Sequence, residues 1–145
     1  SSYEQSFSLL YPYEFMQLLK CGEVSSFNND GHNFLINRGE DFKALYYIIE
    51  GKAAVLGENN FELTSLISGD WISEMSFLSN QKTSSGVKSE SIKVLSWEKD
   101  SLIKMKEDMP DIYNKLTGII SRNICAKLCK ATKDNMKLQN SLNTY

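Results

Sequence analysis

The feature that most constrains the fold is a series of short apolar runs, separated by glycine or asparagine, that fills the middle of the 145-residue chain. Runs of this kind predict β-strands joined by turns. Many short strands at nearly regular spacing favour an antiparallel sandwich or barrel. The predicted strands are Asn33–Ile36, Leu45–Ile49, Ala53–Leu56, Phe61–Leu66, Ser85–Lys88 and Ile92–Trp97. Turns are predicted at residues 29–31, 38–40, 50–51, 57–60 and 68–70.

Helices are expected on both sides of this region. The segment Pro12–Lys20 has proline in its first turn and a glycine just beyond its end, as helices often do. A second helix is predicted over Asp100–Met105, and a third begins near Pro110. Its apolar residues step by three or four positions: Tyr113, Leu116, Ile120, Ile124 and Leu128. Because this stripe weakens, we expect residues 130–145 to fray unless a partner covers them.

The length suits one domain and is too short for two with good cores. Within it we expect an N-terminal helical segment (1–22), a β-barrel with an inserted helical turn (23–98), C-terminal helices (99–130) and a tail (131–145). The predicted fold class is mainly β with flanking α: an antiparallel β-barrel of the jelly-roll type with helices at both ends.

The charge balance argues against nucleic-acid binding. The chain has 16 basic and 18 acidic residues, so it lacks an overall positive field. Nine of the basic residues and five of the acidic ones follow residue 98, and we interpret this basic end as a solvated helix face. Too few residues follow Leu128 for a helix-turn-helix motif, so we expect no DNA binding by this chain.

Cellular location is predicted from what the sequence contains. It has neither a membrane-length apolar run nor a secretory signal at its start. Three cysteines, an odd number, suit a reducing compartment. We therefore expect a cytoplasmic domain, and because it begins at Ser1, one excised from a longer protein whose other segments provide any membrane attachment.

The sequence contains few residues of the kinds that catalytic or metal-binding sites need. His32 is the only histidine and lies among asparagines. Cys125 and Cys129 share one helix face, and we interpret them as small buried hydrophobic residues because no second ligand pair accompanies them. The sequence also lacks a nucleophile elbow, a P-loop and a Rossmann fingerprint. We expect neither an enzyme nor a metal site.

One segment, residues 69–78, does not fit the strand pattern. It predicts a single helical turn that begins near Ser73 and opens into the barrel. The first N–H groups of such a turn have no helical partners and favour an anion such as phosphate. Trp71 and Phe77 are interpreted as core residues rather than as platforms for a base.

Together these residues resemble the cyclic nucleotide-binding domain, the family of bacterial catabolite activators, kinase regulatory subunits and gated channels. The likeness spans about residues 7–130 and is carried by Gly39-Glu40, Leu45–Gly51, Val55, Leu66, Gly69-Asp70, Glu74, Phe77-Leu78, Val87 and Val94-Leu95. The stretch from Val94 to Leu128, with Trp97, Leu102 and Pro110, is also similar to the Popeye proteins, membrane-anchored relatives of the same fold.

The resemblance implies a phosphate cassette, in which a Gly-Glu pair precedes an arginine. The glutamate accepts a hydrogen bond from the ribose hydroxyl, and the arginine pairs with the cyclic phosphate. Glu74 occupies the glutamate position, whereas Ser73 replaces the glycine and Thr83 replaces the arginine. The candidate ligand-binding residues are Ser73, Glu74, Met75, Ser76, Thr83, Ser84 and Ser85, with cAMP or cGMP as the ligand and no other cofactor.

The missing arginine decides how strongly such a ligand binds. A charge-assisted hydrogen bond contributes about 1.5 to 3 kcal/mol, so its loss weakens binding by about tenfold to a hundredfold. Lys82 does not replace the arginine, because in an extended segment it faces away from its neighbour Thr83. The serine at position 73 has two possible uses, since its hydroxyl can cap the short helix or donate to a phosphate.

Two functions follow as expectations. The first is a regulatory sensor domain that binds a cyclic nucleotide or a related small anion weakly and relays this through the C-terminal helices, with a lid near Leu128. The alternative is a ligand-free domain that forms a homodimer or binds a partner through the apolar helix from Ile112 to Leu128.

Overall fold

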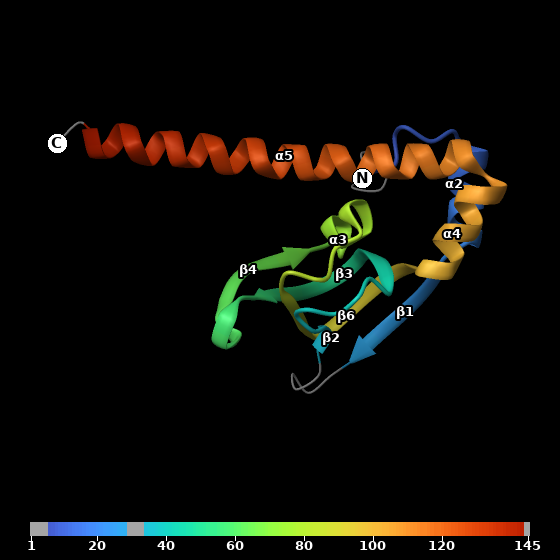
Figure 1. Cartoon of the computed structure of the whole chain (residues 1–145), viewed down its shortest axis with the longest axis horizontal. Coiled ribbons are helices and arrows are strands. Elements are labelled where there is room, and N and C mark those ends of the chain that lie inside the picture. The colour runs from blue at the N-terminus through green and yellow to red at the C-terminus, as the bar shows by residue number, and fades with distance from the viewer. Residues whose placement is uncertain (1–5, 29–33, 144–145) are drawn as a thin grey trace.

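The computed structural model describes residues 6–28 and 34–143. One antiparallel sheet curls into a half-barrel, and a long C-terminal helix runs along one side of it (Figure 1). The elements in chain order are α2 (Pro12–Lys20), β1 (Glu23–Asn28), β2 (Phe34–Ile36), β3 (Ala44–Leu56), the 3₁₀-helix η1 (Glu58–Asn60), β4 (Glu62–Ile67), β5 (Trp71–Ile72), α3 (Glu74–Ser79), β6 (Gly86–Glu98), α4 (Lys99–Asp108) and α5 (Pro110–Asn143).

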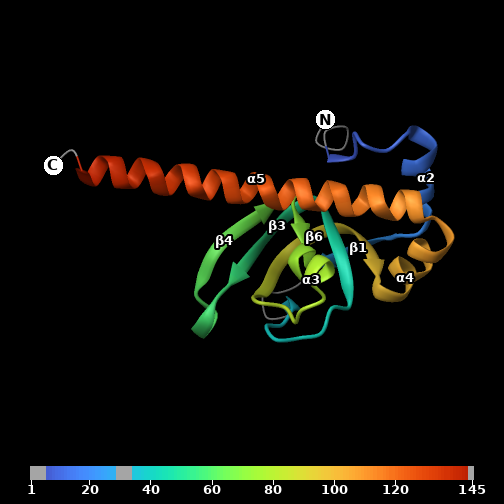
Figure 2. The ribbon, with the colours of Figure 1, turned by 45° about the horizontal axis from the view of Figure 1, so that its top comes forward.

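The sheet is built around its two longest strands, β3 and β6. Its main order is β1-β6-β3-β4, with β2 paired to β6 and β5 paired to β3, and every pairing is antiparallel. Figure 2 shows α3 lying directly beneath the middle of α5, while α2 and α4 gather at one end of the sheet. This architecture confirms the predicted fold class in the form of a curled half-barrel with flanking helices.

Both faces of the long strands are buried, so the molecule has two apolar clusters. Ile48 and Val94 face the inside of the half-barrel, and their neighbours Tyr47 and Leu95 point to the other face, as strand geometry requires. The helices cover this outer face, where Trp97 Nε1 donates a 2.9 Å hydrogen bond to the Leu18 carbonyl.

The predicted strands are confirmed in place but wrong in number. Leu45–Ile49 and Ala53–Leu56 form the single strand β3, and Ser85–Lys88 and Ile92–Trp97 are merged in β6, which begins at Gly86. The turn predicted at 50–51 is wrong, because both residues lie within β3, between two register irregularities of that strand, and Gly51 has φ +98°. The turns predicted at 38–40 and 68–70 are present, whereas 29–31 lies outside the described residues, as do Asn33 and His32.

The C-terminal helices are longer than predicted. The helix predicted over Asp100–Met105 extends over the whole of α4, and α5 continues for 34 residues. The expected fraying of residues 130–145 is therefore wrong as far as Asn143, beyond which the structure is not described. Within the described ranges, no helix combines the length and the hydropathy needed to cross a membrane.

A buried ion pair fixes α2 against α5. Glu14 accepts hydrogen bonds from the Tyr11 amide (2.9 Å) and from Lys115 Nζ (2.6 Å). These bonds hold the pKa of the Glu14 carboxyl below its ordinary value, and the bond from Lys115 contributes most. Both bonds are accepted by Oε1 of Glu14, so this carboxylate is paired within the chain and belongs to the scaffold.

The path of β3 at position 51 depends on glycine. A Cβ at position 51 would lie 2.5 Å from the Ser91 carbonyl oxygen, whereas a Cβ at Gly39, which also has a positive φ of +81°, would meet nothing within 4 Å. We predict that Gly51→Ala lowers the free energy of unfolding by more than Gly39→Ala, whose cost is about 1 to 2 kcal/mol from the left-handed backbone alone. Denaturant unfolding of both variants measures this, and equal losses would contradict the close approach.

Candidate ligand cavity

The site begins where β5 ends and α3 starts. Ser73 separates them and adopts a left-handed conformation with φ 72° and ψ 16°. Such a conformation favours glycine, which explains why a glycine suits this position in the family that the sequence resembles. The Ser73 side chain makes no capping hydrogen bond, so the first of the two uses considered for its hydroxyl is wrong. The helical turn itself, predicted to begin near Ser73, is confirmed by α3.

A cavity of about 240 Å³ opens beside this turn. It is lined by all seven candidate residues, namely Ser73, Glu74, Met75, Ser76, Thr83, Ser84 and Ser85. Residues from β2, β3, β4, β5 and β6 complete it with an apolar wall, and Lys127 of α5 closes one side. The volume is slightly below the about 300 to 1,000 Å³ usual for small-molecule sites, so a nucleotide would extend to the rim.

Glu74 is the only acidic residue that lines the cavity, and its side chain is 13% exposed. Its Oε1 accepts a 3.2 Å hydrogen bond from Lys127 Nζ, while its buried Oε2 has no partner among the described residues. Loss of solvation raises the pKa of this carboxyl, with a smaller contribution from Asp70, and the nearby Lys127 opposes the rise. A buried acceptor without a donor is costly, so this oxygen is suited to a hydroxyl group of a ligand.

The contrast with Glu14 separates a scaffold carboxylate from a candidate site carboxylate. Glu14 has a donor from the backbone and another from Lys115, and its pKa is lowered. Glu74 has one side-chain donor, Lys127, and its pKa is raised. Perturbed carboxylates in cavities are frequently functional.

Two candidate hydroxyl groups are already engaged with the backbone. Thr83 Oγ1 donates to the Asn37 carbonyl (2.7 Å) and accepts from the Glu40 amide (3.0 Å), and its own backbone is paired with residues 39 and 40. The Ser76 hydroxyl donates to the Gln81 carbonyl. The Thr83 bonds hold the segment after α3 against the turn before β3. Among the seven candidates, Ser73, Ser84 and Ser85 are the residues whose hydroxyls have no such bond among the described contacts.

Lys127 is the residue that sequence reasoning missed. The lid was expected near Leu128, but the Leu128 side chain is 62% exposed and does not line the cavity, whereas its neighbour Lys127 does. The only signal was the predicted helix itself, since contact between α5 and α3 spans 53 positions. A second contact joins the same helices, because the rings of Phe77 and Tyr113 lie 6.0 Å apart. Lys82 is exposed and, as expected, does not line the cavity.

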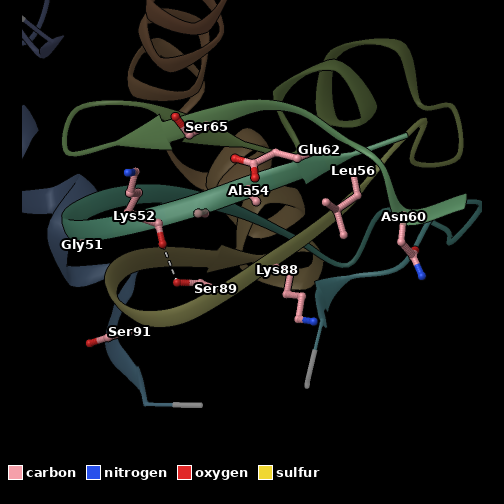
Figure 3. A pocket seen from close by; sticks show the side chains of 11 residues that line it. Gly51, Lys52, Ala54, Leu56, Asn60, Glu62, Ser65, Lys88, Ser89 and Ser91 are labelled. Atoms are coloured by element: carbon pink, nitrogen blue, oxygen red, sulfur yellow. Dashed lines mark hydrogen bonds between the residues drawn. The ribbon is translucent and has the colours of Figure 1, made fainter. Parts of the chain in front are cut away.

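A larger hollow of about 760 Å³ lies elsewhere, along β3, β4 and β6. Figure 3 shows its polar side chains spread along the strands instead of converging on one point. Its buried serine, Ser89, already donates to the Lys52 carbonyl at 2.6 Å. Because no buried titratable group faces this hollow, the smaller cavity at Glu74 is the better candidate for a specific ligand.

No group of three or more potential metal ligands occurs among the residues that the structure describes, and His32 lies outside them. Cys125 and Cys129 are exposed on α5, so their interpretation as buried hydrophobic residues is wrong. The buried residues of α5 end at Ile120, and both cysteines lie beyond them on the exposed part of the helix.

The raised pKa of Glu74 predicts a pH dependence. Because the folded state holds this proton more tightly than the unfolded chain does, the contribution of Glu74 to stability is fully present below its ordinary value of 4.5 and declines as the pH rises through the folded value. We expect the unfolding free energy of the native chain, relative to Glu74→Gln, to decrease from acidic pH to neutrality. Denaturant unfolding at several pH values measures this, and a constant difference would contradict it.

Comparison with known proteins identifies the family and the fold. The profile of the cyclic nucleotide-binding domain matches residues 21–108. A search of curated proteins found no match. Among solved structures, the chain is similar to a cyclic nucleotide-binding domain from Methylobacillus flagellatus, with a TM-score of 0.78, 15% identity, and 93% of this chain and 83% of that chain covered.

Two further structures share the fold. PKAR CBD2 with Sp-2Cl-cAMPS bound gives a TM-score of 0.69 at 20% identity, with 94% and 86% of the two chains covered. The second is the regulatory subunit of a cAMP-independent protein kinase A from Trypanosoma brucei, in a mutant form bound to cAMP in its A site. Its TM-score is 0.68 at 22% identity, and the match covers 82% of this chain and 42% of that chain. Because the family profile covers more than half of the sequence, the chain belongs to the cyclic nucleotide-binding domain family.

Proposed function

We propose that this chain is a regulatory sensor domain whose cavity binds a cyclic nucleotide weakly. In this proposal Glu74 accepts a hydrogen bond from the ribose hydroxyl group. The observation that carries the proposal is the buried Glu74 Oε2, which has no donor among the described residues. A ligand hydroxyl would satisfy that oxygen without breaking the bond between Oε1 and Lys127. The domain is non-catalytic in this proposal and acts through a conformational change.

The relay follows from the contacts of α3. This helix touches α5 through Glu74 with Lys127 and through Phe77 with Tyr113. A ligand that binds Glu74 acts directly on one of these two contacts. Binding would then favour one arrangement of α3 and α5 over another, and α5 would transmit the change.

Weak binding is expected because Thr83 brings no positive charge to the cassette. The cAMP-independent kinase subunit whose mutant form binds cAMP is a related domain in which substitutions accompany cAMP binding, and this supports testing the cassette by substitution. cAMP and cGMP remain equal candidates, since no residue of the cavity described above discriminates between the two bases.

Substitution of Thr83 tests the proposed cassette. Thr83→Arg adds a cation but also removes the bonds to Asn37 and Glu40, so Thr83→Val, which removes the same bonds without adding charge, is its matched control. We predict that Thr83→Arg binds cAMP about tenfold or more tightly than Thr83→Val, the value of one charge-assisted hydrogen bond. Isothermal titration measures both, and equal affinities would contradict the position of the cassette.

A second candidate function, assembly of two copies through α5, is favoured by a separate observation. The expected dimer face from Ile112 to Leu128 is wrong as far as Ile120, because Ile112, Leu116, Ile119 and Ile120 are buried against the chain's own core. Another apolar stripe starts where the core ends and continues along the helix: Ile124, Leu128, Ala131, Asn135 and Leu138. Its steps alternate between four and three residues, which is the seam of a coiled coil.

This stripe lies beside the face that packs on the body. Beyond Lys127 the positions that continue its face of the helix are charged, with Lys130, Asp134 and Lys137. The stripe differs, because its Leu128, Ala131 and Leu138 are apolar and exposed and its Asn135 is its single polar member. In Figure 1 this part of α5 extends past β4, away from the sheet. A single asparagine among apolar core positions favours a parallel pair of helices in one register, so a second copy of this chain fits the stripe.

Two equally exposed residues of α5 distinguish the stripe from the rest of the helix. Leu138 lies on it and is 62% exposed, whereas Met136 lies off it and is 57% exposed. We predict that the chain dimerises with increasing concentration, that Leu138→Lys raises the dimer dissociation constant about tenfold or more, and that Met136→Lys leaves it unchanged. Sedimentation equilibrium measures all three, and a concentration-independent monomer would exclude the dimer.

A further inference from the structure

We infer that Lys127 of α5 is the cation that binds the anionic group of the ligand, in place of an arginine in the loop after α3. This inference rests on the proposed function, because it concerns the same cavity. It adds the residue that recognises the charge of the ligand and places that residue on the C-terminal helix.

The first step is the inventory of charges at the cavity. Of the residues that line it, Lys127 is the only cation and Glu74 the only acid. Thr83 is neutral, and its hydroxyl is used by Asn37 and Glu40. An anion that enters this cavity can therefore pair with one positively charged side chain among the lining residues, and that side chain belongs to α5.

The second step is the position of the Lys127 ammonium group. It bonds Glu74 Oε1 at 3.2 Å, which uses one of its three donors, and its side chain is 41% exposed. It therefore lies at the rim, partly in water, where a nucleotide too large for a cavity of about 240 Å³ would extend. A ligand hydroxyl on Glu74 Oε2 and a ligand anion on Lys127 satisfy both groups without breaking their mutual bond.

The third step is the electrostatic balance. Glu74 repels an anion while it is ionised, and its pairing with Lys127 reduces this repulsion. Burial also favours the protonated form of Glu74, since its pKa is raised. The pair thus recognises a ligand that combines a hydroxyl donor with a negative charge, and it binds neutral analogues by the hydroxyl alone.

This assignment gives the relay a direct physical cause. Ile120 is buried in the core and Ile124 packs against it, and Lys127 lies about one turn beyond Ile124 along the helix. An anion on Lys127 therefore acts on α5 itself as well as on α3. The ligand would bridge the two helices, which a loop arginine would not do.

The test compares a charged ligand with a neutral one on matched variants. Titration calorimetry of the 145-residue chain with cAMP and with adenosine is repeated for Lys127→Gln and for Lys130→Gln, a control in which the replaced lysine lies one turn away, is exposed and does not line the cavity. We expect Lys127→Gln to weaken cAMP binding about tenfold or more and to change adenosine binding by less than about twofold. Lys130→Gln should change neither, and Lys127→Arg should retain cAMP binding because its charge is kept.

The other outcomes overturn the inference in distinguishable ways. Unchanged cAMP affinity in Lys127→Gln would remove Lys127 from anion binding and leave the proposed function intact. An equal loss for cAMP and adenosine would show that Lys127 only positions Glu74, which also contradicts the inference. A native chain that binds neither ligand at millimolar concentration would end both the inference and the proposed function.

Discussion

The packing of α5 against the sheet is the constraint on which the site depends. Leu116 and Ile120 are completely buried in the outer cluster, together with Tyr47, Trp71 and Trp97 of the sheet. Because these contacts fix the rotation and position of the helix, they also fix the position of Lys127, two turns beyond Ile120. The ion pair with Glu74 is a consequence of core packing, and any change in that packing would move the cation relative to the cavity.

The cavity combines an apolar wall with a small number of polar groups, some of which stabilise the backbone while others face the cavity. Thr83 and Ser76 bond to the backbone and hold the loop after α3 in place. Glu74 and Lys127 face the cavity and leave one oxygen without a donor. This division means that the scaffold around the site is complete without a ligand, whereas the site itself is not.

Much of the fold and most of the site were predictable from the sequence. Short apolar runs separated by glycine or asparagine predicted most of the strands, and the seven residues chosen from the resemblance line one cavity. The turn at Gly51 was predicted wrongly because a glycine at positive φ is typical of turns, and here it lies within a long strand, between two register irregularities. β1, with only Val24 and Phe27 as apolar residues, is a strand because it pairs with β6.

Lys127 was beyond prediction for a different reason. Its partner is 53 positions away, and the contact depends on how α5 rotates on the core, which local sequence patterns do not specify. The same applies to Cys125 and Cys129, whose helix was predicted correctly but whose exposure depends on which face the core covers.

The central claim is that Glu74 Oε2 accepts a hydrogen bond from a hydroxyl group of the ligand ribose, and the removal of that hydroxyl group tests it most directly. Calorimetric affinities of cAMP and 2′-deoxy-cAMP, measured on the native chain and on Glu74→Ala, form a double-mutant cycle. The account predicts that the deoxy ligand binds the native chain about tenfold more weakly than cAMP, and that the two ligands bind Glu74→Ala equally. Equal binding of both ligands to the native chain would contradict it.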